Sequence, residues 1–279
     1  MGAPMARNLH RAGMLQGVWN RTSSKATALA AELGCLAAAT PAQLALECEL
    51  LVMCVSADAD VRAIVGELEP VIRHGQILID CSTVSADTAR NAAALLGPKG
   101  AEVLDCPVSG GVEGAAKGTL AIMVGGAATT LARAMPVLQA LGGTITHFGP
   151  NGAGQVAKAA NQIVCAGVNR ANAEALAFAK SQGLDLEKVI GTLGRGAAAN
   201  WYLQNRGPNM ARGTYPPGFR VRLHQKDLLI CRAMAAAAGS ALPVIEETLA
   251  DYAQLIRDGY GDEDISALFR LKSKLFSPN

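Results

Sequence analysis

Residues 77–106 read ILIDCSTVSADTARNAAALLGPKGAEVLDC. The run Ile77–Cys81 is short and apolar, a second such run covers Glu102–Cys106, and each predicts a strand. Between them, Ser85 is a typical helix N-cap residue, and the alanine-rich segment after it reaches Leu96 just before a Gly-Pro stop. A strand, a helix and a second strand in succession predict a βαβ unit and a parallel sheet.

The same alternation extends over residues 1–150. Further strands are expected at Gly17–Asn20, Leu50–Val55, Leu120–Val124 and Thr144–Phe148. Ser23 is expected to cap a helix that stops at Gly34. The fold class is therefore α/β, with a Rossmann-type doubly wound sheet forming a dinucleotide-binding domain over residues 1–150.

After residue 150 the pattern becomes helical. The β-branched runs disappear, and long alanine- and leucine-rich segments cover Gly154–Gln182, Asp185–Leu193, Leu223–Ala238 and Pro243–Asp258. We predict that residues 151–279 form an all-α domain for substrate binding and oligomerisation. The helix that starts near Gly154 is expected to connect the two domains directly.

Composition excludes several classes of protein. The 279 residues are 50% hydrophobic and 17% charged, and a net charge of +2 from scattered Lys and Arg gives no footprint for nucleic acid or an acidic membrane. Neither a signal peptide nor a membrane-spanning run is evident, so we expect a soluble cytoplasmic protein. Seven dispersed cysteines without a CxxC pair, and four dispersed histidines, suggest neither a disulfide framework nor a metal site.

The N-terminal stretch MGAPMARNLHRAG contains only the end of a dinucleotide-binding motif. A Rossmann domain normally begins with a strand followed by GxGxxG, whose glycines bring the backbone close to a pyrophosphate at a helix N-terminus. Gly2 matches the last of these glycines, Ala3–Ala12 is expected to form the helix, and Gly13 its C-cap. The first strand is missing, so we expect a start upstream or a damaged fold; an ordinary N-terminus of another α/β domain is the alternative.

Asn20 and Arg21 follow the next expected strand, near the spacing of the residue that recognises the adenosine ribose. NAD enzymes favour Asp or Glu there, because a carboxylate accepts the 2′-hydroxyl and repels a 2′-phosphate. Neutral Asn20 removes that repulsion, and Arg21 can form charge-assisted bonds to phosphate. The pair favours NADP over NAD, with a solvated arginine in a turn as the alternative.

A glycine-rich segment, DCPVSGGVEGAAKGTLAIMVGG, covers Asp105–Gly126. It places Ser109, Gly110 and Gly111 directly after an expected strand. Successive backbone N–H groups there can form an anion nest beside a serine hydroxyl, which suits a substrate carboxylate. On glycine content alone, a plain flexible turn explains the segment equally well.

Lys158 lies on an otherwise apolar helix in the segment GPNGAGQVAKAANQ, Gly149–Gln162. The polar residues that share its face at helical spacing are Gln162, Cys165, Asn169 and Asn172. Polar groups on so apolar a helix are hydrogen-bonded when buried, so this stripe is expected to face water, a partner or a site. The amides of Asn161 and Gln162 can hold an ammonium in place, whereas most helical lysines are merely solvated.

Lys158 is the candidate acid/base. A dehydrogenase needs one group that takes the hydroxyl proton on oxidation and returns it on reduction, and a desolvated lysine with a lowered pKa does this near neutral pH. His224 lies near Lys226 and Asp227, but we interpret it as an ordinary residue of the second domain. The dipeptide Lys226-Asp227 is most simply a structural ion pair.

Five segments in order resemble the β-hydroxyacid dehydrogenase family, which includes 3-hydroxyisobutyrate dehydrogenases, tartronate semialdehyde reductases and glyoxylate/succinic semialdehyde reductases. They are MGAPMARNL, IDCSTVS, DCPVSGGVEGAAKGTLAIMVGG, GAGQVAKAANQ and HQKDLLICRAMA, and they span the chain. The resemblance implies an oxidoreductase that moves a hydride between NADP(H) or NAD(H) and a small β-hydroxy acid or its semialdehyde. The missing first strand and first two motif glycines depart from the family pattern and bear on cofactor binding.

The resemblance also implies roles for individual residues. Lys158 is the catalytic residue, and the substrate-binding residues are Ser109, Gly110, Gly111, Asn161 and Gln162. Cofactor-binding residues are Gly2, Asn20, Arg21, Val55, Ser56, Thr83 and Lys226, with Asp227 supporting Lys226. Some members carry a second Asn where this chain has Gln162, so the reach of this amide and the substrate preference are expected to differ.

Three other interpretations stay open. A catalytically silent oligomeric scaffold or binding protein of the same fold would tolerate the shortened start, but it has no need for the lysine, the nest and the amide pair together. An imine reductase is similar in fold but usually lacks the acid/base lysine, and a phosphogluconate dehydrogenase is longer and needs a phosphate-binding array. The resemblance further implies a homodimer or homotetramer.

Overall fold

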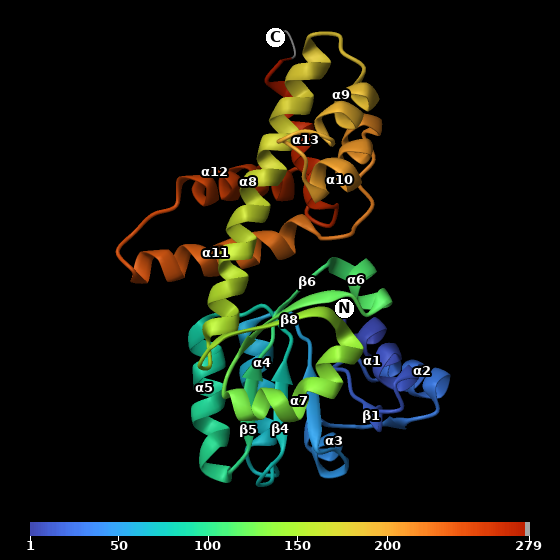
Figure 1. Cartoon of the computed structure of the whole chain (residues 1–279), viewed down its shortest axis with the longest axis vertical. Helices are drawn as coiled ribbons and strands as arrows, with labels where there is room; N and C mark the ends of the chain where they lie inside the picture. The colour runs from blue at the N-terminus through green and yellow to red at the C-terminus, as the bar shows by residue number, and fades with distance from the viewer. Residues whose placement is uncertain (277–279) are drawn as a thin grey trace. The chain divides into compact units, whose positions relative to one another are not determined.

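The computed structural model describes residues 1–276 (Figure 1). Its contacts divide the chain into two compact units, one from Met1 to Lys158 and one from Ala159 onward. The first unit alternates strands with helices, and the described part of the second is built from helices. The predicted fold class, a Rossmann-type sheet followed by an all-α domain, is confirmed.

The first unit contains eight strands and the first seven helices. The strands are β1 Gly17–Val18, β2 Leu36–Ala37, β3 Leu50–Met53, β4 Ile77–Asp80, β5 Glu102–Asp105, β6 Val108–Ser109, β7 Leu120–Gly125 and β8 Gly142–Gly149. The helices are α1 Gly2–Arg11, α2 Ser23–Leu33, α3 Pro41–Glu47, α4 Asp58–Leu68, α5 Ala86–Leu96, α6 Gly111–Lys117 and α7 Ala128–Leu141, with a 3₁₀ turn at Gly97–Lys99. The long helix α8, Ala153–Ser181, begins in this unit.

The strands form two separate sheets. Strands β1 and β2 pair in parallel with each other, whereas the other six strands form a sheet of order β3-β4-β5-β7-β6 with β8 beside β7. In the part of the chain that the structure describes, no strand joins the two sheets. The edge of β3 that faces away from β4 therefore has no neighbouring strand among residues 1–276.

The larger sheet is mixed, which corrects the prediction of a parallel sheet. Strands β3, β4 and β5 are parallel, but β7 runs antiparallel to both β5 and β6. The cause is the short glycine-rich connection through α6, which reverses the chain between Ser109 and Leu120 and is too short for a parallel crossover. The two-residue strands β2 and β6 were not predicted because so short a run carries no periodicity.

Helices cover both faces of this sheet (Figure 1). On one face, Ile79 and Leu104 pack with α1 and α7 through Met5 and Leu138. On the opposite face, the intervening strand residues pack against α3, α4 and α5. The residues buried there include Leu78, Val103, Ala45, Ile64 and Leu96. The alternation of the two clusters along each strand follows from the period of two in strand side chains.

Of the four predicted helix caps, two are confirmed and two are wrong by one position. Helix α1 ends at Arg11 with Ala12 as its C-cap, so the prediction of Gly13 is wrong, because the left-handed glycine lies one residue beyond the cap. Ser85 caps α5 as predicted, because its hydroxyl accepts a hydrogen bond from the Thr88 N–H. Gly34 ends α2 with a left-handed φ of 63°, also as predicted. Ser23, however, is the first helical residue of α2 and Thr22 the N-cap, so the Ser23 cap prediction is wrong by one position. An exposed helix start of this kind has no packing that selects one of several adjacent hydroxyl residues.

In the second unit, the described residues up to 276 continue α8 and form five further helices and a 3₁₀ turn. These are α9 Leu186–Leu193, α10 Trp201–Arg212, α11 Val221–Ala237, α12 Pro243–Arg257, the turn Ile265–Ala267 and α13 Leu268–Lys274. They share one core whose members include Leu176, Leu228, Tyr252 and Leu268. Helices α10 and α13 were not predicted; α10 contains Pro208, and its low apolar content hides its period.

None of the helices within residues 1–276 is both long and apolar enough to cross a bilayer.

Candidate active site

The loops after β3 and β4 carry three of the residues predicted to bind cofactor. Val55 and Thr83 are half-buried and Ser56 is exposed. The two loops are joined directly, because the Val55 N–H donates to the Ser82 hydroxyl at 2.9 Å. Both loops leave the carboxyl ends of parallel strands, which is where ligands bind in open α/β sheets.

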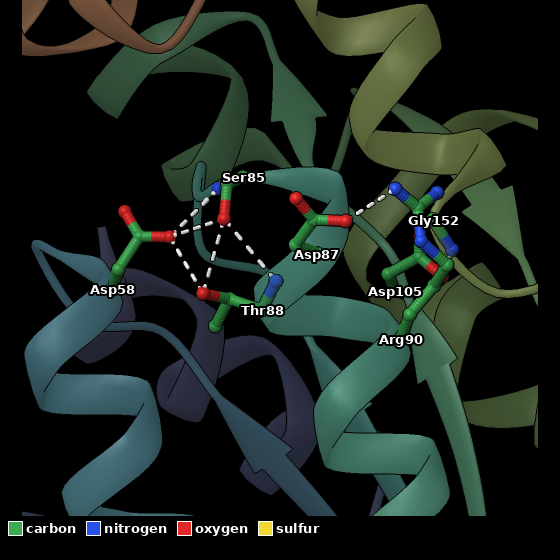
Figure 2. A network of polar contacts seen from close by, with 7 residues as sticks. All are labelled: Asp58, Ser85, Asp87, Thr88, Arg90, Asp105 and Gly152. Carbon is green, nitrogen blue, oxygen red and sulfur yellow. Dashed lines mark hydrogen bonds and ion pairs between the residues drawn. The ribbon is translucent and has the colours of Figure 1, made fainter. Parts of the chain in front are cut away.

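Asp58, the first residue of α4, connects the segment after β3 to the segment after β4. Its Oδ1 accepts hydrogen bonds from the Ser85 N–H at 2.9 Å, the Ser85 hydroxyl at 2.7 Å and the Thr88 hydroxyl at 2.7 Å (Figure 2). Burial acts to raise the pKa of Asp58, but these hydrogen bonds outweigh it and the pKa is lowered. An ionised carboxylate therefore holds the first turns of α4 and α5 next to each other.

The predicted nucleotide residues gather near the end of β3. Gly2 opens α1, and a Cβ built on it would lie 4.0 Å from Cβ of Cys54. Asn20 and Arg21 are exposed, and the Arg21 guanidinium pairs with Asp60 in the first turn of α4 at 2.7 Å. The start of α1, the predicted ribose-recognition residues and the end of β3 thus share one region, at the strand ends where nucleotides bind in Rossmann domains.

The segment Ser109–Gly111, predicted to bind the substrate carboxylate, contains two glycines with positive φ. Gly110 has φ of 126° and Gly111 has φ of 64°, conformations that side chains disfavour. Gly110 and Gly111 are exposed and Ser109 is half-buried. A Cβ on Gly110 would also approach the Leu120 side chain to 3.3 Å, so glycine is needed there for both conformation and space.

The first turn of α8 is anchored to the sheet by Asp105, at the end of β5. Its Oδ1 accepts the Gly152 N–H at 2.8 Å, and its Oδ2 accepts the Gln155 N–H at 3.1 Å. The approach is so close that a Cβ on Gly154 would lie 2.5 Å from the carbonyl oxygens of Asp105 and Met123. The glycines of this motif therefore serve close packing of the helix on the strand ends. Lys158, one turn after Gly154, is buried with 6% of its surface exposed.

In the second unit, Gln162, Lys226 and Asp227 form one polar chain. The Gln162 Nε2 donates to Oδ2 of Asp227 at 2.6 Å, and the Lys226 ammonium pairs with Oδ1 of Asp227 at 2.8 Å. The half-buried Asn161 donates to Oε1 of Gln162 at 2.8 Å. His224 is fully buried, with Nδ1 2.9 Å from the Tyr252 hydroxyl, consistent with its interpretation as a residue of this domain.

The polar stripe along α8 is used mainly inside the fold, which corrects its interpretation as a surface facing water, a partner or a site. Asn169 is fully buried and donates to the Ile265 carbonyl at 2.9 Å. Asn172 donates to Oδ1 of Asn200 at 2.9 Å. These amides satisfy backbone and side-chain groups where α8 passes through the helical core, so helical spacing alone placed them on the same face as functional candidates.

Sequence reasoning missed Asp58, Asp105 and Gln155. Gln155 and Asp105 lie inside motifs that were recognised, but their partners are far along the chain. The signal that marks them is a polar residue in an apolar setting beside glycines, which predicts a buried hydrogen-bonding group but not its partner.

Asp80 is a buried carboxyl beside this anchor. It lies opposite Asp105 on the neighbouring strand, its Oδ1 accepts the Ser82 N–H at 2.9 Å, and its Oδ2 has no hydrogen-bond partner within the described residues. Burial, with a smaller repulsion from Asp105 and Asp58, raises the pKa of Asp80 to about 7.

This raised pKa predicts a stabilising substitution. The unfolded chain releases the Asp80 proton near its ordinary pKa of 3.8 whereas the folded chain holds it to about 7, so folding stability falls as pH rises between these values and then levels off. Asp80→Asn is expected to raise the free energy of unfolding at pH 8 by about 2–4 kcal/mol and to have little effect at pH 4. Urea unfolding at both pH values measures this. The exposed Asp87→Asn is the control, and equal effects of Asp80→Asn at both pH values would contradict the prediction.

The fold, together with the polar residues at the carboxyl ends of the strands, defines a nucleotide-dependent oxidoreductase with a Rossmann domain and a helical domain. Residues 1–149 match a family model described as the NAD binding domain of 6-phosphogluconate dehydrogenase, and residues 152–272 match one described as the NAD-binding of NADP-dependent 3-hydroxyisobutyrate dehydrogenase. The chain belongs to the β-hydroxyacid dehydrogenase family, and it is an NAD(P)-dependent dehydrogenase.

Three relatives illustrate the similarity. The NAD-dependent L-serine dehydrogenase of Pseudomonas aeruginosa is 35% identical, over 100% of this chain and 95% of the relative. The 3-hydroxyisobutyrate dehydrogenase of the same organism is 37% identical, over 88% of this chain and 85% of the relative. A solved structure of Mycobacterium tuberculosis 3-hydroxyisobutyrate dehydrogenase with L-serine has a TM-score of 0.88 and 33% identity, covering 97% of this chain and 95% of that one.

Proposed function

We propose that this protein transfers a hydride between NADP(H) and a small β-hydroxy acid or its semialdehyde, with Lys158 as general acid/base. The observation that carries the proposal is the buried position of Lys158, one turn beyond the point where Asp105 anchors α8 to the strand ends. An ammonium is rarely buried without a function or a partner. The likeness to hydroxyacid dehydrogenases supports this proposal at the level of the reaction class.

In the proposed mechanism, the bound nicotinamide supplies or accepts the hydride. Lys158 Nζ donates a proton to the carbonyl oxygen when a semialdehyde is reduced and removes the hydroxyl proton when the alcohol is oxidised. Substrate would be held by its carboxylate at the backbone of Ser109, Gly110 and Gly111, where two exposed glycines leave the backbone amides open to an anion.

The remaining assignments complete this proposal. Asn161 and Gln162 position substrate and the lysine, and Gly2, Val55, Ser56 and Thr83 hold the cofactor. Lys226 is assigned to cofactor binding, and its ammonium is oriented by Asp227. The carboxylate of Asp227 also accepts from Gln162, so one acid orients a candidate substrate residue and a candidate cofactor residue. An extra methylene in Gln162, compared with Asn, is expected to favour the smaller members of the substrate class.

The test is a spectrophotometric assay of the protein with NADPH or NADH for reduction and with NADP⁺ or NAD⁺ for oxidation. The panel contains glyoxylate and succinic, methylmalonic and tartronic semialdehydes for reduction, and 3-hydroxyisobutyrate and L-serine for oxidation. Turnover of methylmalonic or tartronic semialdehyde, 3-hydroxyisobutyrate or L-serine, in which the reactive carbon is β to the carboxylate, supports the proposal. Turnover of glyoxylate or succinic semialdehyde alone would contradict the β-hydroxy acid assignment. Folded protein that neither oxidises nor reduces a cofactor with any compound would favour the silent scaffold instead.

Arg21 provides a separate test of cofactor preference. Its exposed pair with Asp60 is weak, so its guanidinium is able to turn to a 2′-phosphate. Arg21→Ala is expected to lower kcat/KM for NADPH by about 10-fold or more and to change that for NADH little, because only NADPH carries the phosphate. Steady-state kinetics with both cofactors measures the ratio.

Asp60→Asn is the matched control for this test. It removes the competing carboxylate but leaves the arginine, so we expect a higher preference for NADPH. If Arg21→Ala lowers kcat/KM equally for both cofactors, the assignment of NADP preference to this residue is wrong.

A further inference from the structure

The side chain of Gln155 bridges α8 to the loop that carries Thr83. Gln155 is 1% exposed. Its Nε2 donates to the Ser82 carbonyl at 2.9 Å, and its Oε1 accepts the Val84 N–H at 3.1 Å. One amide thus binds the backbone on both sides of Thr83, and a primary amide is the neutral group that offers this donor and acceptor together.

The bridge continues on both sides. The Gln155 backbone N–H is held by Asp105, while the Ser82 hydroxyl accepts the Val55 N–H and the Ser82 N–H is held by Asp80. The candidate cofactor loops after β3 and β4 are therefore connected through a single buried residue to the helix turn that ends at Lys158. The contacts are buried, so water offers no substitute partners when one is removed.

We propose that Gln155 is a positioning residue that sets the Thr83 loop relative to the lysine turn of α8, and thereby sets the distance between cofactor and acid/base. The proposal rests on the proposed function for its effect on catalysis. The role of Gln155 is positioning because its hydrogen bonds go to the loop backbone and to Asp105. Because it lies three residues before Lys158 on the same helix, a shift of its amide displaces the loop and the lysine relative to each other.

Two substitutions separate positioning from packing. Gln155→Leu removes both hydrogen bonds at similar size. Gln155→Glu keeps the acceptor for the Val84 N–H but, when ionised, opposes the Ser82 carbonyl oxygen; when protonated it is able to donate to that oxygen. We expect Gln155→Glu to lower kcat by about 10- to 100-fold at pH 8 and to recover as pH falls, while Gln155→Leu stays low throughout, with each rate compared with the wild type at the same pH.

Gln76 provides a matched control in the same unit. It is also a buried glutamine, donating to the carbonyls of Ala45 and Cys48 at 2.7 and 2.6 Å and accepting the Arg73 N–H at 2.6 Å. It directly precedes β4, at the amino end of the strand, whereas the candidate site lies at the carboxyl ends of the strands. Gln76→Glu is expected to lower stability comparably but to leave the kcat of folded protein unchanged.

Hydrogen exchange on the ligand-free protein tests the bridge without activity. Both Gln155 variants are expected to raise the exchange rate of peptides covering residues 82–84 by about tenfold at pH 8, and Gln76→Glu is expected to leave it unchanged. Unchanged exchange in Gln155→Leu overturns the proposal, as does an equal kcat loss in Gln76→Glu. A wild-type protein without turnover would instead overturn the proposed function, with exchange still deciding whether Gln155 holds the loop.

Discussion

Lys158→Ala is expected to lower kcat by about 10²- to 10⁴-fold, the range that general acid/base catalysis contributes. The loss falls on kcat because the proton moves only in the chemical step, whereas the substrate carboxylate and the cofactor bind through other groups. Stopped-flow and steady-state assays of NADPH oxidation measure it. A small primary amine such as methylammonium is expected to restore part of the rate, because it can occupy the space left by the side chain and donate the proton.

Lys180→Ala is the control for this prediction. Lys180 lies near the end of the same helix but is exposed, with its ammonium 5.9 Å from the centre of the Phe269 ring. Its substitution is expected to leave kcat unchanged. Circular dichroism and thermal unfolding of both variants establish that the proteins compared are folded. If Lys158→Ala keeps more than about a tenth of the wild-type kcat, another group supplies the proton and the assignment is wrong.

Gly154→Ala is expected to have the second largest effect, and it acts on both stability and catalysis. The added Cβ would lie 2.5 Å from two backbone oxygens and 2.9 Å from Oδ2 of Asp105, and backbone cannot move aside as a flexible side chain does. Overpacking of this kind costs about 1–3 kcal/mol or more. We expect a loss of that size in the free energy of unfolding, measured by urea denaturation, and a fall in kcat because the turn that carries Lys158 is displaced.

Gly66→Ala is the matched control. Gly66 also lies inside a helix of the first unit, in α4, but nothing lies within 4 Å of a Cβ built there. Alanine is expected to stabilise the protein by up to about 1 kcal/mol, because it is the better helix former. A neutral Gly154→Ala, or one no different from Gly66→Ala, would show that α8 is not packed on the strand ends as described.

The candidate residues of the site were largely recognisable from sequence, because motifs are local. Lys158, the pair Asn20-Arg21 and the glycines at 110 and 111 each stand in a short run whose chemistry is evident from neighbouring residues. The groups that hold these candidates in place were not recognisable. Gln155 reaches Ser82, 73 residues away, and Asp105 reaches Gly152, 47 residues away. No period in the sequence relates such pairs.

The polar face of α8 that carries Lys158 is a second case in which the sequence does not identify hydrogen-bond partners. Spacing correctly placed Gln162, Asn169 and Asn172 on one side of α8, but Asn169 and Asn172 satisfy the helical core, and Gln162 pairs with Asp227. A polar residue at helical spacing indicates a buried hydrogen bond as readily as a site. Which of the two it makes depends on the elements packed against it.

The amino-acid sequence was enough to predict the fold class, the change from an α/β to an all-α pattern, the Ser85 and Gly34 helix caps and the candidate site residues. These depend on side-chain periodicity, capping and glycine conformations, which act within a few residues. The folded structure was needed to show that β7 runs antiparallel and that Asp80 is buried beside Asp105. It was also needed to show that Gln155 hydrogen-bonds to the backbone on both sides of Thr83. Those features depend on which distant groups share a water-excluded space, where every polar atom without a partner carries a cost in free energy.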